Sequence, residues 1–225
     1  MKATYYGHAT VQLDTGKVSL LFDPFIRPNK LAAAIDVKQI KPDFILLSHG
    51  HEDHIADLFE IQKNSNATII CIADILYWLN RKGITKVHGM NIGGAFRFEF
   101  GRVKMVHALH SSSLPDGSYG GSPAGYLIQA NGKNVYFAGD TALTYDMKLL
   151  AGEQLDWAFL PIGDNFTMGV DDAITAAGFI NCKNIIGIHF NTFPPIQINE
   201  QEAMDKFAKA GLNLQLLPIG QTLQL

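Results

Sequence analysis

The sequence has few of the features that mark secreted or membrane proteins. Only two of its 225 residues are cysteines, Cys71 in an apolar run and Cys182 at the end of a helical pattern, and neither has metal-site spacing. We expect two buried, reduced thiols rather than a disulfide. No run approaches the roughly 18 apolar residues of a membrane span, and the first residues lack the apolar core of a signal peptide. These absences predict a cytoplasmic protein without a membrane partner.

Charge is also scarce, because charged residues make up only 17% of the chain and the net charge is −3. There is no cluster of Lys and Arg that would attract a phosphate backbone, so nucleic acid is not an expected partner. Apolar residues make up 47%, which is enough for a sizeable core and excludes a disordered chain. We expect residues 1–225 to form one domain, and the sequence leaves open whether it assembles as a homo-oligomer.

Each half of the chain contains a succession of strands followed by alternating strands and helices. Apolar periodicity predicts strands at 2–6, 10–13, 18–22, 44–47, 67–73, 96–100, 103–106, 124–130, 134–138, 157–161, 184–188, 214–217 and 222–225. It predicts helices at 52–64, 74–82, 171–181 and 199–210. Asn131-Gly132 is the strongest hairpin signal. This two-fold rhythm predicts an αββα sandwich, in which two mixed β-sheets are flanked by helices.

Local signals add detail to this outline. Asp74 is the expected cap of the second helix, and Gly83 is its expected stop. His88 is expected in a surface turn before Gly89. A turn at residues 101–102 is expected to join two strands, and residues 111–123, rich in Ser, Gly and Pro, are expected to form a loop.

The densest group of chemically active side chains is the hexapeptide at residues 49–54. It reads His49-Gly50-His51-Glu52-Asp53-His54 and follows the apolar strand at 44–47 directly. Ligand sites in α/β proteins lie at such strand ends, and imidazole with carboxylate suits zinc as well as iron, manganese or nickel. The alternative, a capped helix start with solvated histidines, is less consistent with so many ligands in six residues.

The hexapeptide resembles the signature of the metallo-β-lactamase superfamily. That superfamily completes its site with a later histidine, an aspartate in a Gly-Asp pair and a final histidine, for which His110, Asp140 and His189 are candidates. The resemblance implies one metal held by His49, His51 and His110, a second held by Asp53, His54 and His189, and Asp140 as the bridge. It therefore implies two divalent ions, with zinc as the first expectation and manganese, iron or nickel as alternatives.

The whole chain resembles a small bacterial group of metal-dependent hydrolases related to ascorbate-6-phosphate lactonase. The segments that carry this likeness are residues 6–9, 21–25 and 160–169, together with the hexapeptide. The resemblance implies the αββα fold and a hydrolase activity on a small-molecule substrate. It does not identify the substrate.

Two histidines compete for the third ligand position of the first metal. His110 follows the strand at 103–106, whereas His107 stands at the apolar end of that strand, where a packed core histidine is more usual. We therefore favour His110. His8, after Gly7, is open to three interpretations: a partner of a metal ligand, a substrate contact or a turn histidine.

Two aspartates have uncertain roles. Asp23, before Pro24, either initiates a turn or resembles an acidic residue that lies beneath the metal site in the superfamily. Asp164, in the loop after the strand at 157–161, is expected to orient His189, to line the cleft, to donate a proton or to cap its own loop.

The expected chemistry is hydrolysis by a hydroxide shared between two metals. Two ions about 3.5–4 Å apart lower the pKa of a bound water, and the hydroxide then cleaves an ester-type bond, a lactone or a phosphoester. We expect the site to lie in a cleft formed by residues 49–54, 110–123, 140–141, 163–169 and 189–195. The candidate catalytic residues are Asp53, Asp140, His8 and Asp164. The alternatives are a small phosphodiesterase or nuclease-like hydrolase, and a metal- or metabolite-binding protein without turnover.

Overall fold

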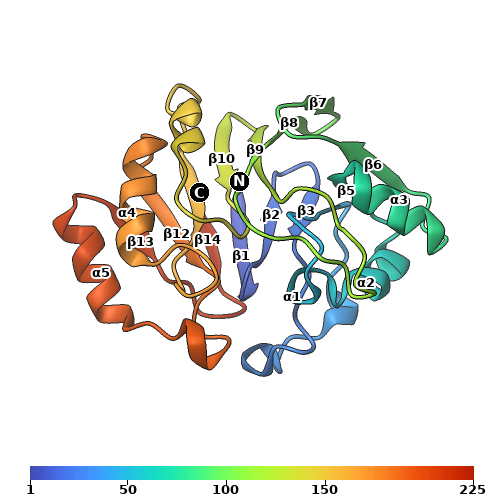
Figure 1. Ribbon diagram of the computed structural model, residues 1–225, viewed down its shortest axis with the longest axis horizontal. Coiled ribbons are helices and arrows are strands. Elements are labelled where there is room, and N and C mark those ends of the chain that lie inside the picture. The colour runs from blue at the N-terminus through green and yellow to red at the C-terminus, as the bar shows by residue number, and fades with distance from the viewer.

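The computed structural model describes residues 1–225 and contains two seven-stranded sheets packed face to face, with helices on both outer sides (Figure 1). The predicted αββα sandwich is therefore confirmed. The first sheet has the order β14 (Thr222–Gln224), β1 (Lys2–Gly7), β2 (Thr10–Asp14), β3 (Ser19–Phe22), β4 (Phe44–Leu46), β5 (Thr68–Ile72) and β6 (Val87–Met90). The second has the order β13 (Asn213–Gln215), β12 (Asn184–Ile188), β11 (Trp157–Pro161), β10 (Lys133–Phe137), β9 (Ala124–Ala130), β8 (Gly101–His107) and β7 (Ala95–Phe98).

Each sheet is antiparallel in one half and parallel in the other. Strands β14, β1, β2 and β3 are antiparallel neighbours, and β3 to β6 are parallel. The second sheet repeats this arrangement, with β7 to β10 antiparallel and β10 to β13 parallel. Asn131 and Gly132 have φ values of 49° and 69° and form the two-residue turn between β9 and β10, as predicted. The similar order of strands and helices in the two halves of the sequence thus corresponds to two sheets of the same construction.

Helices α2 (Leu58–Ser65) and α3 (Ala73–Arg81) cover the first sheet, and α4 (Val170–Phe179) and α5 (Glu200–Lys209) cover the second (Figure 1). A short helix α1 (Glu52–Ile55) lies between β4 and α2. The 3-10 helices are η1 (Lys30–Ala32), η2 (Val37–Gln39), η3 (Tyr145–Leu150) and η4 (Pro194–Ile196). None of the helices is both long enough and apolar enough to cross a lipid bilayer. Both cysteines are buried and free, as expected.

The two sheets are joined by aromatic packing and by hydrogen bonds that cross the sandwich. The ring of Phe22 stacks on that of Phe137 at a centroid distance of 4.4 Å, deep in the core. The Tyr126 hydroxyl of β9 donates to the Leu47 carbonyl at 2.7 Å, and the Ala124 amide donates to the Ser48 carbonyl at 2.9 Å. These bonds fix the chain directly before the histidine-rich hexapeptide, at the boundary between the two sheets.

The single helix expected at residues 52–64 is wrong, because the chain forms α1 and α2 with a break between them. The break is at Asp57, whose carboxylate accepts hydrogen bonds from the amides of Ile26 and Arg27 at 2.6 and 2.9 Å. The Asp57 amide donates to the Pro24 carbonyl at 3.0 Å. These contacts with a distant segment replace the helical bonds at this position, so local periodicity did not reveal the break.

Three other local expectations are also wrong. His88 lies in β6 rather than in a turn, and its ring packs 4.4 Å from that of Phe96. The turn between β7 and β8 falls at residues 99–100 instead of 101–102, because buried Phe100 packs against Phe44. Asp74 makes no capping hydrogen bond, since α3 begins at Ala73 directly after β5.

Candidate metal centre

The chain reverses direction sharply at one edge of the sandwich, where several strands end. His8 follows β1, Asp23 follows β3 and His189 follows β12, and these three residues have positive φ values of 54°, 43° and 56°. Left-handed backbone costs roughly 1–3 kcal/mol for residues other than glycine, so it persists only where the surrounding structure holds it. Strands β1 and β3 run in the same direction on either side of β2, so both end at one edge of the first sheet. The end of β12 in the second sheet is joined to this edge by the His189 amide, which donates to the His8 carbonyl at 2.7 Å.

His49, His51 and His110 form a first group of potential metal ligands. One ring nitrogen from each lies within 4.8 Å of those of the other two. His49 Nε2 is 2.9 Å from His51 Nδ1, and the His110 ring lies 5.1 Å from each of the other rings. His51 Nε2 also lies 3.3 Å from the Ser111 hydroxyl. The structure thus brings together the three histidines that the resemblance assigned to one metal.

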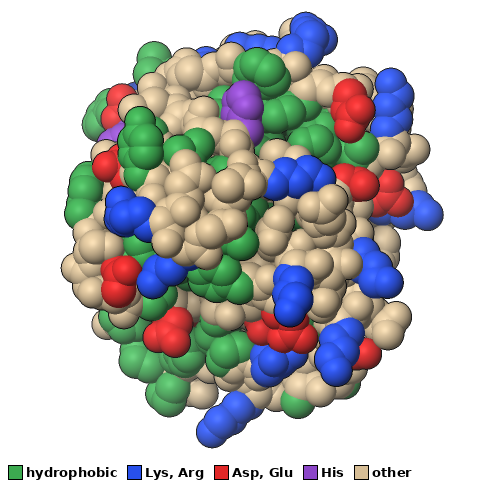
Figure 2. All heavy atoms as spheres, turned by 90° about the vertical axis from the view of Figure 1, so that its right-hand side faces the viewer, with side chains coloured by type: hydrophobic (Ala, Val, Ile, Leu, Met, Phe, Trp, Pro, Cys, Tyr) green, Lys and Arg blue, Asp and Glu red, His purple; other side chains and the backbone are tan.

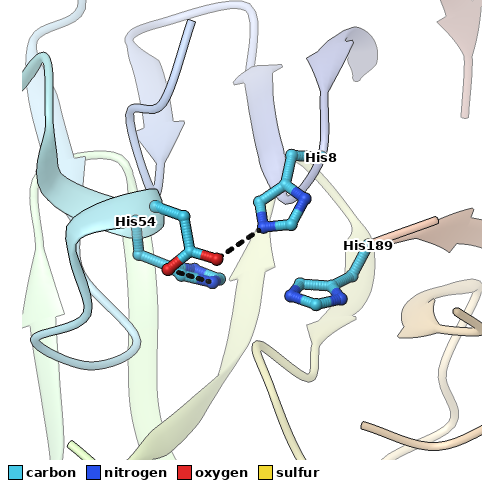
Figure 3. A group of neighbouring side chains, drawn as sticks. His8, His54 and His189 are labelled. Carbon is cyan, nitrogen blue, oxygen red and sulfur yellow. Dashed lines mark hydrogen bonds and ion pairs between the residues drawn. The ribbon is translucent and has the colours of Figure 1, made fainter. Parts of the chain in front are cut away.

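A second group contains His8, Asp53, His54 and His189, again with potential ligand atoms within 4.8 Å of one another. Figure 3 shows the rings of His8, His54 and His189 converging on one space from three different elements. Asp53 Oδ1 is 4.0 Å from His54 Nε2, and Asp53 Oδ2 is 3.1 Å from His8 Nε2. The expected second set is therefore also together, and His8 joins it as a direct contact of Asp53.

Asp140 lies between the two groups. Its Oδ2 atom is 3.6 Å from His110 Nε2 of the first group, and it is 3.3 and 3.0 Å from His54 Nε2 and His189 Nε2 of the second. Asp140 is almost completely buried, directly beyond β10. One carboxylate oxygen thus contacts histidines of both groups.

Asp23 and Ser48 orient two of the histidines from beneath. Asp23 Oδ2 accepts from His54 Nδ1 at 2.8 Å and from the Ser48 hydroxyl at 2.5 Å. The same hydroxyl is 2.9 Å from His49 Nδ1. With Nδ1 occupied, both rings direct Nε2 toward the cluster, an arrangement typical of metal-binding histidines. Asp23 was a candidate for this position, whereas Ser48 was missed, although its place next to His49 was a signal.

The residues present fit a metal ion. His54 Nε2 and Asp140 Oδ1 are buried side-chain atoms of the cluster without a hydrogen-bond partner. Leaving such atoms unpaired costs about 1–3 kcal/mol each, so a native core rarely concentrates them at one point. A set of imidazole and carboxylate donors is what zinc, manganese, iron and nickel bind in proteins. Coordination would satisfy lone pairs that the protein itself leaves free.

The electrostatics of the cluster also suit a cation. Burial lowers the pKa of His49 well below its usual value, which keeps this imidazole neutral and able to bind metal. Burial also opposes the charged form of His54, but Asp140 and Asp23 outweigh it and raise the pKa of His54 well above its usual value. Burial opposes the charge of Asp140 too, yet His189 and His54 hold its pKa well below the usual range. Positive charge is therefore stabilised between these carboxylates.

Asp164 and His107 lie outside both groups. Asp164 has a φ of 62°, its Oδ1 accepts from the Asn165 amide at 2.8 Å, and its own amide donates to the Met168 carbonyl. It makes no hydrogen bond to His189, whereas it does cap its own loop and also lines a cavity with Asn165 and Val170. A role for Asp164 as a proton donor stays a prediction. His107 is the half-buried last residue of β8 and pairs with Ala124.

Comparisons with known proteins agree with this geometry. Residues 19–190 match the family model described as a beta-lactamase superfamily domain. The chain is 51% identical to a UPF0173 metal-dependent hydrolase of Flavobacterium johnsoniae over 226 residues, with 100% of both chains covered. A second UPF0173 metal-dependent hydrolase, from Christiangramia forsetii, is also 51% identical, with both chains covered completely.

A solved structure supports the same assignment. Igni18, a metallo hydrolase from the hyperthermophilic archaeon Ignicoccus hospitalis, superposes with a TM-score of 0.88 at 33% identity, covering 99% of this chain and 97% of that one. The relation to ascorbate-6-phosphate lactonase stays a prediction. The fold, the clustered ligands and the full-length similarity together show that this chain belongs to the metallo-β-lactamase superfamily, within the UPF0173 metal-dependent hydrolases.

Proposed function

We propose that this protein is a dinuclear metal hydrolase that cleaves an ester-type bond, foremost a lactone, in an uncharged small molecule. The observation that carries the proposal is the position of Asp140, whose Oδ2 atom lies 3.0–3.6 Å from histidines of both ligand groups. A carboxylate shared in this way suits two adjacent cations, because it partly relieves their repulsion. A mononuclear site would leave one of the two groups without a function.

In this proposal each of two metal ions would be held by three side chains, with Asp140 placed to serve both. The first set is His49, His51 and His110, and the second is Asp53, His54 and His189. Divalent ions held there would supply Lewis acidity, which would make a water molecule more acidic and would offset negative charge on the substrate. The Asp53 side chain is 30% exposed, so water that enters the site can reach this carboxylate. Asp53 can therefore orient that water.

A cavity of about 550 Å³ beside His110 supports an uncharged substrate. Its walls come from residues 107–113, 117–119 and 121–123, and they include Ser113, Ser122 and Tyr119, which carry hydroxyl groups, but no Lys, Arg, Asp or Glu. Hydroxyl and backbone groups bind carbonyl and hydroxyl functions, whereas a phosphate beyond the reacting centre is usually bound by cationic side chains. This composition favours a lactone over a phosphodiester.

The charge on the face beside α2 and α3 also gives no support to the nuclease alternative. Figure 2 shows the face on the side of α2 and α3, where Lys and Arg side chains lie singly among acidic and uncharged ones. Binding of nucleic acid depends on several cations that together neutralise successive phosphates. This face offers no continuous basic path.

The test is hydrolysis by protein that has been stripped of metal and then reloaded with zinc or manganese. Dihydrocoumarin represents lactones, bis-p-nitrophenyl phosphate represents phosphodiesters, and a p-nitrophenyl thioester completes the panel. We expect metal-dependent turnover of dihydrocoumarin that a chelator abolishes, and slower turnover of the phosphodiester. Protein that binds metal yet hydrolyses nothing in the panel would instead support the binding function without turnover.

A further inference from the structure

His8 is fixed through both its backbone and its ring. Its carbonyl accepts hydrogen bonds from the His189 amide at 2.7 Å and from the Tyr5 hydroxyl at 3.1 Å. Its side chain is fully buried, with Nε2 3.1 Å from Asp53 Oδ2 and Nδ1 3.0 Å from the Thr192 hydroxyl. The imidazole therefore connects the loop after β12 to the carboxylate on α1.

The two ring contacts define which nitrogen carries the proton. An ionised carboxylate only accepts hydrogen bonds, so the contact with Asp53 requires a proton on His8 Nε2. In a neutral imidazole, Nδ1 is then an acceptor, and the Thr192 hydroxyl must donate to it. The other acceptor near that hydroxyl, the Phe190 carbonyl, is farther away at 3.4 Å. Donation from Thr192 to His8 thus satisfies every polar group in this chain of contacts.

The tautomer of His8 determines how Asp53 faces the cluster. Asp53 is on α1, a helix of only four residues, and its side chain is partly exposed, so packing alone holds it weakly. With Oδ2 bonded to His8, Oδ1 is the oxygen directed toward His54 Nε2, at 4.0 Å. If Nδ1 carried the proton instead, the lone pair of Nε2 would face the carboxylate and repel it.

We propose that Thr192 is a positioning residue that acts through His8. Its hydroxyl donates to His8 Nδ1, which keeps the proton on Nε2 and holds the Asp53 carboxylate with Oδ1 toward the second ligand group. His8 is the direct partner of Asp53, and loss of such a partner of a metal ligand typically costs tenfold to a hundredfold in activity or metal affinity. Thr192 would thereby link the loop that follows His189 to the orientation of Asp53.

The first experiment measures the tautomer directly in metal-free protein, by a long-range ¹H–¹⁵N correlation spectrum of the histidine side chains at neutral pH. We expect His8 to be protonated on Nε2 in the wild type and in Thr192→Ser, which keeps the hydroxyl. Thr192→Val removes only the hydroxyl and should shift His8 toward the Nδ1 form. Thr167→Val is the matched control, because its hydroxyl contacts only the Met168 carbonyl. A wild-type His8 protonated on Nδ1 or on both nitrogens would overturn the proposal, as would an unchanged tautomer in Thr192→Val.

The second experiment rests on the proposed function and uses zinc-loaded protein with dihydrocoumarin. Thr192→Val should lower kcat by about tenfold to a hundredfold with little change in KM, and Thr192→Ser should restore it. A wild-type kcat in a Thr192→Val protein whose tautomer has shifted would overturn the positioning role. If the wild type itself fails to turn over, the proposed function is contradicted, and the tautomer measured without metal still decides whether Thr192 controls His8.

Discussion

Asp140 is the residue on which a shared metal centre depends most. It is buried, its Oδ2 atom contacts histidines of both groups, and its Oδ1 atom has no hydrogen-bond partner. The strands on either side do not use its side chain. Its charge is therefore available for metal ions rather than for the fold.

We expect Asp140→Asn to lose metal from the weaker site and most of its hydrolytic activity. An amide oxygen still coordinates, but it carries no charge to offset two divalent cations about 4 Å apart. Elemental analysis measures the loss. The substitution should lower the midpoint of thermal unfolding less in metal-free protein than in metal-loaded protein, each compared with the wild type in the same state. The reason is that bound metal stabilises the native state. A variant that keeps two metals and wild-type turnover would show that Asp140 is not the bridge.

His110→Ala and His107→Ala should have different effects. His110 lies with His49 and His51, so its removal should release metal and abolish activity. His107 ends β8, so its removal should lower the free energy of unfolding by about 1 kcal/mol, a typical effect of a point substitution, and leave metal binding intact. Metal content and urea denaturation of both variants distinguish the roles. The reverse outcome would assign the third ligand position to His107.

The sequence revealed those site residues that stand close together or directly after a strand. The hexapeptide, Asp140 and His189 all follow apolar strands, so position along the chain was informative. Thr192 was missed because its contact is with His8, at the opposite end of the chain, and no local pattern records such a pair. The sequence could not choose among the roles of Asp164, because the direction of a loop side chain depends on backbone angles such as its φ of 62°, which no local pattern indicates.

At the scale of elements, the loop between β8 and β9 is held in place by α3. Trp78 Nε1 donates to Asp116 Oδ2 at 2.6 Å, and Lys82 Nζ is 3.8 Å from the same oxygen. Leu114, on the same loop, is buried in the core. This loop forms the wall of the cavity beside His110. Its anchorage to α3 therefore defines the shape of the proposed substrate site.

We expect Asp116→Ala to speed hydrogen exchange of the amides at residues 112–120, with no change in the β9–β10 hairpin. Asp116→Asn keeps an acceptor for Trp78 and should have a smaller effect. Equal exchange rates in the wild type and in Asp116→Ala would contradict this anchoring role.

The stabilisation of this loop by the contact between Asp116 and Trp78 should depend on pH. Hydrogen bonds from Ser118 and Trp78 lower the pKa of Asp116 to about 2. Because this pKa lies below the unfolded value of about 3.9, the stabilisation is fully present above about pH 4 and is lost as the pH falls toward 2. Loop protection, measured by hydrogen exchange against pH, should therefore decline in that range in the wild type and scarcely change in Asp116→Ala.

Apolar periodicity in the sequence predicted which segments are helices and which are strands, but it did not predict where several of them begin and end. The break between α1 and α2 arises from bonds between Asp57 and residues 24–27, and the turn between β7 and β8 is set by the packing of Phe100 on Phe44. Strand β6 is short and contains Gly89, and it is stable because it pairs with β5. In each case a contact with a distant segment outweighed the local preference.

At the scale of the whole molecule, each ligand group draws on both sheets. His49 and His51 follow β4 of the first sheet, and His110 follows β8 of the second. Asp53 and His54 likewise follow β4, whereas His189 follows β12. Neither sheet alone contains a complete set, so the centre forms only when the sandwich packs. Metal binding should accordingly raise the stability of the whole sandwich rather than that of one element.

The number of metal ions per chain tests the central claim most directly. Two ligand groups joined by Asp140 predict two ions bound to one chain. The measurement is elemental analysis of protein purified without oxygen, repeated after stripping and reloading with zinc. The account predicts a stoichiometry near two that reloading restores. A reproducible value near one, with no gain on reloading, would contradict the dinuclear centre.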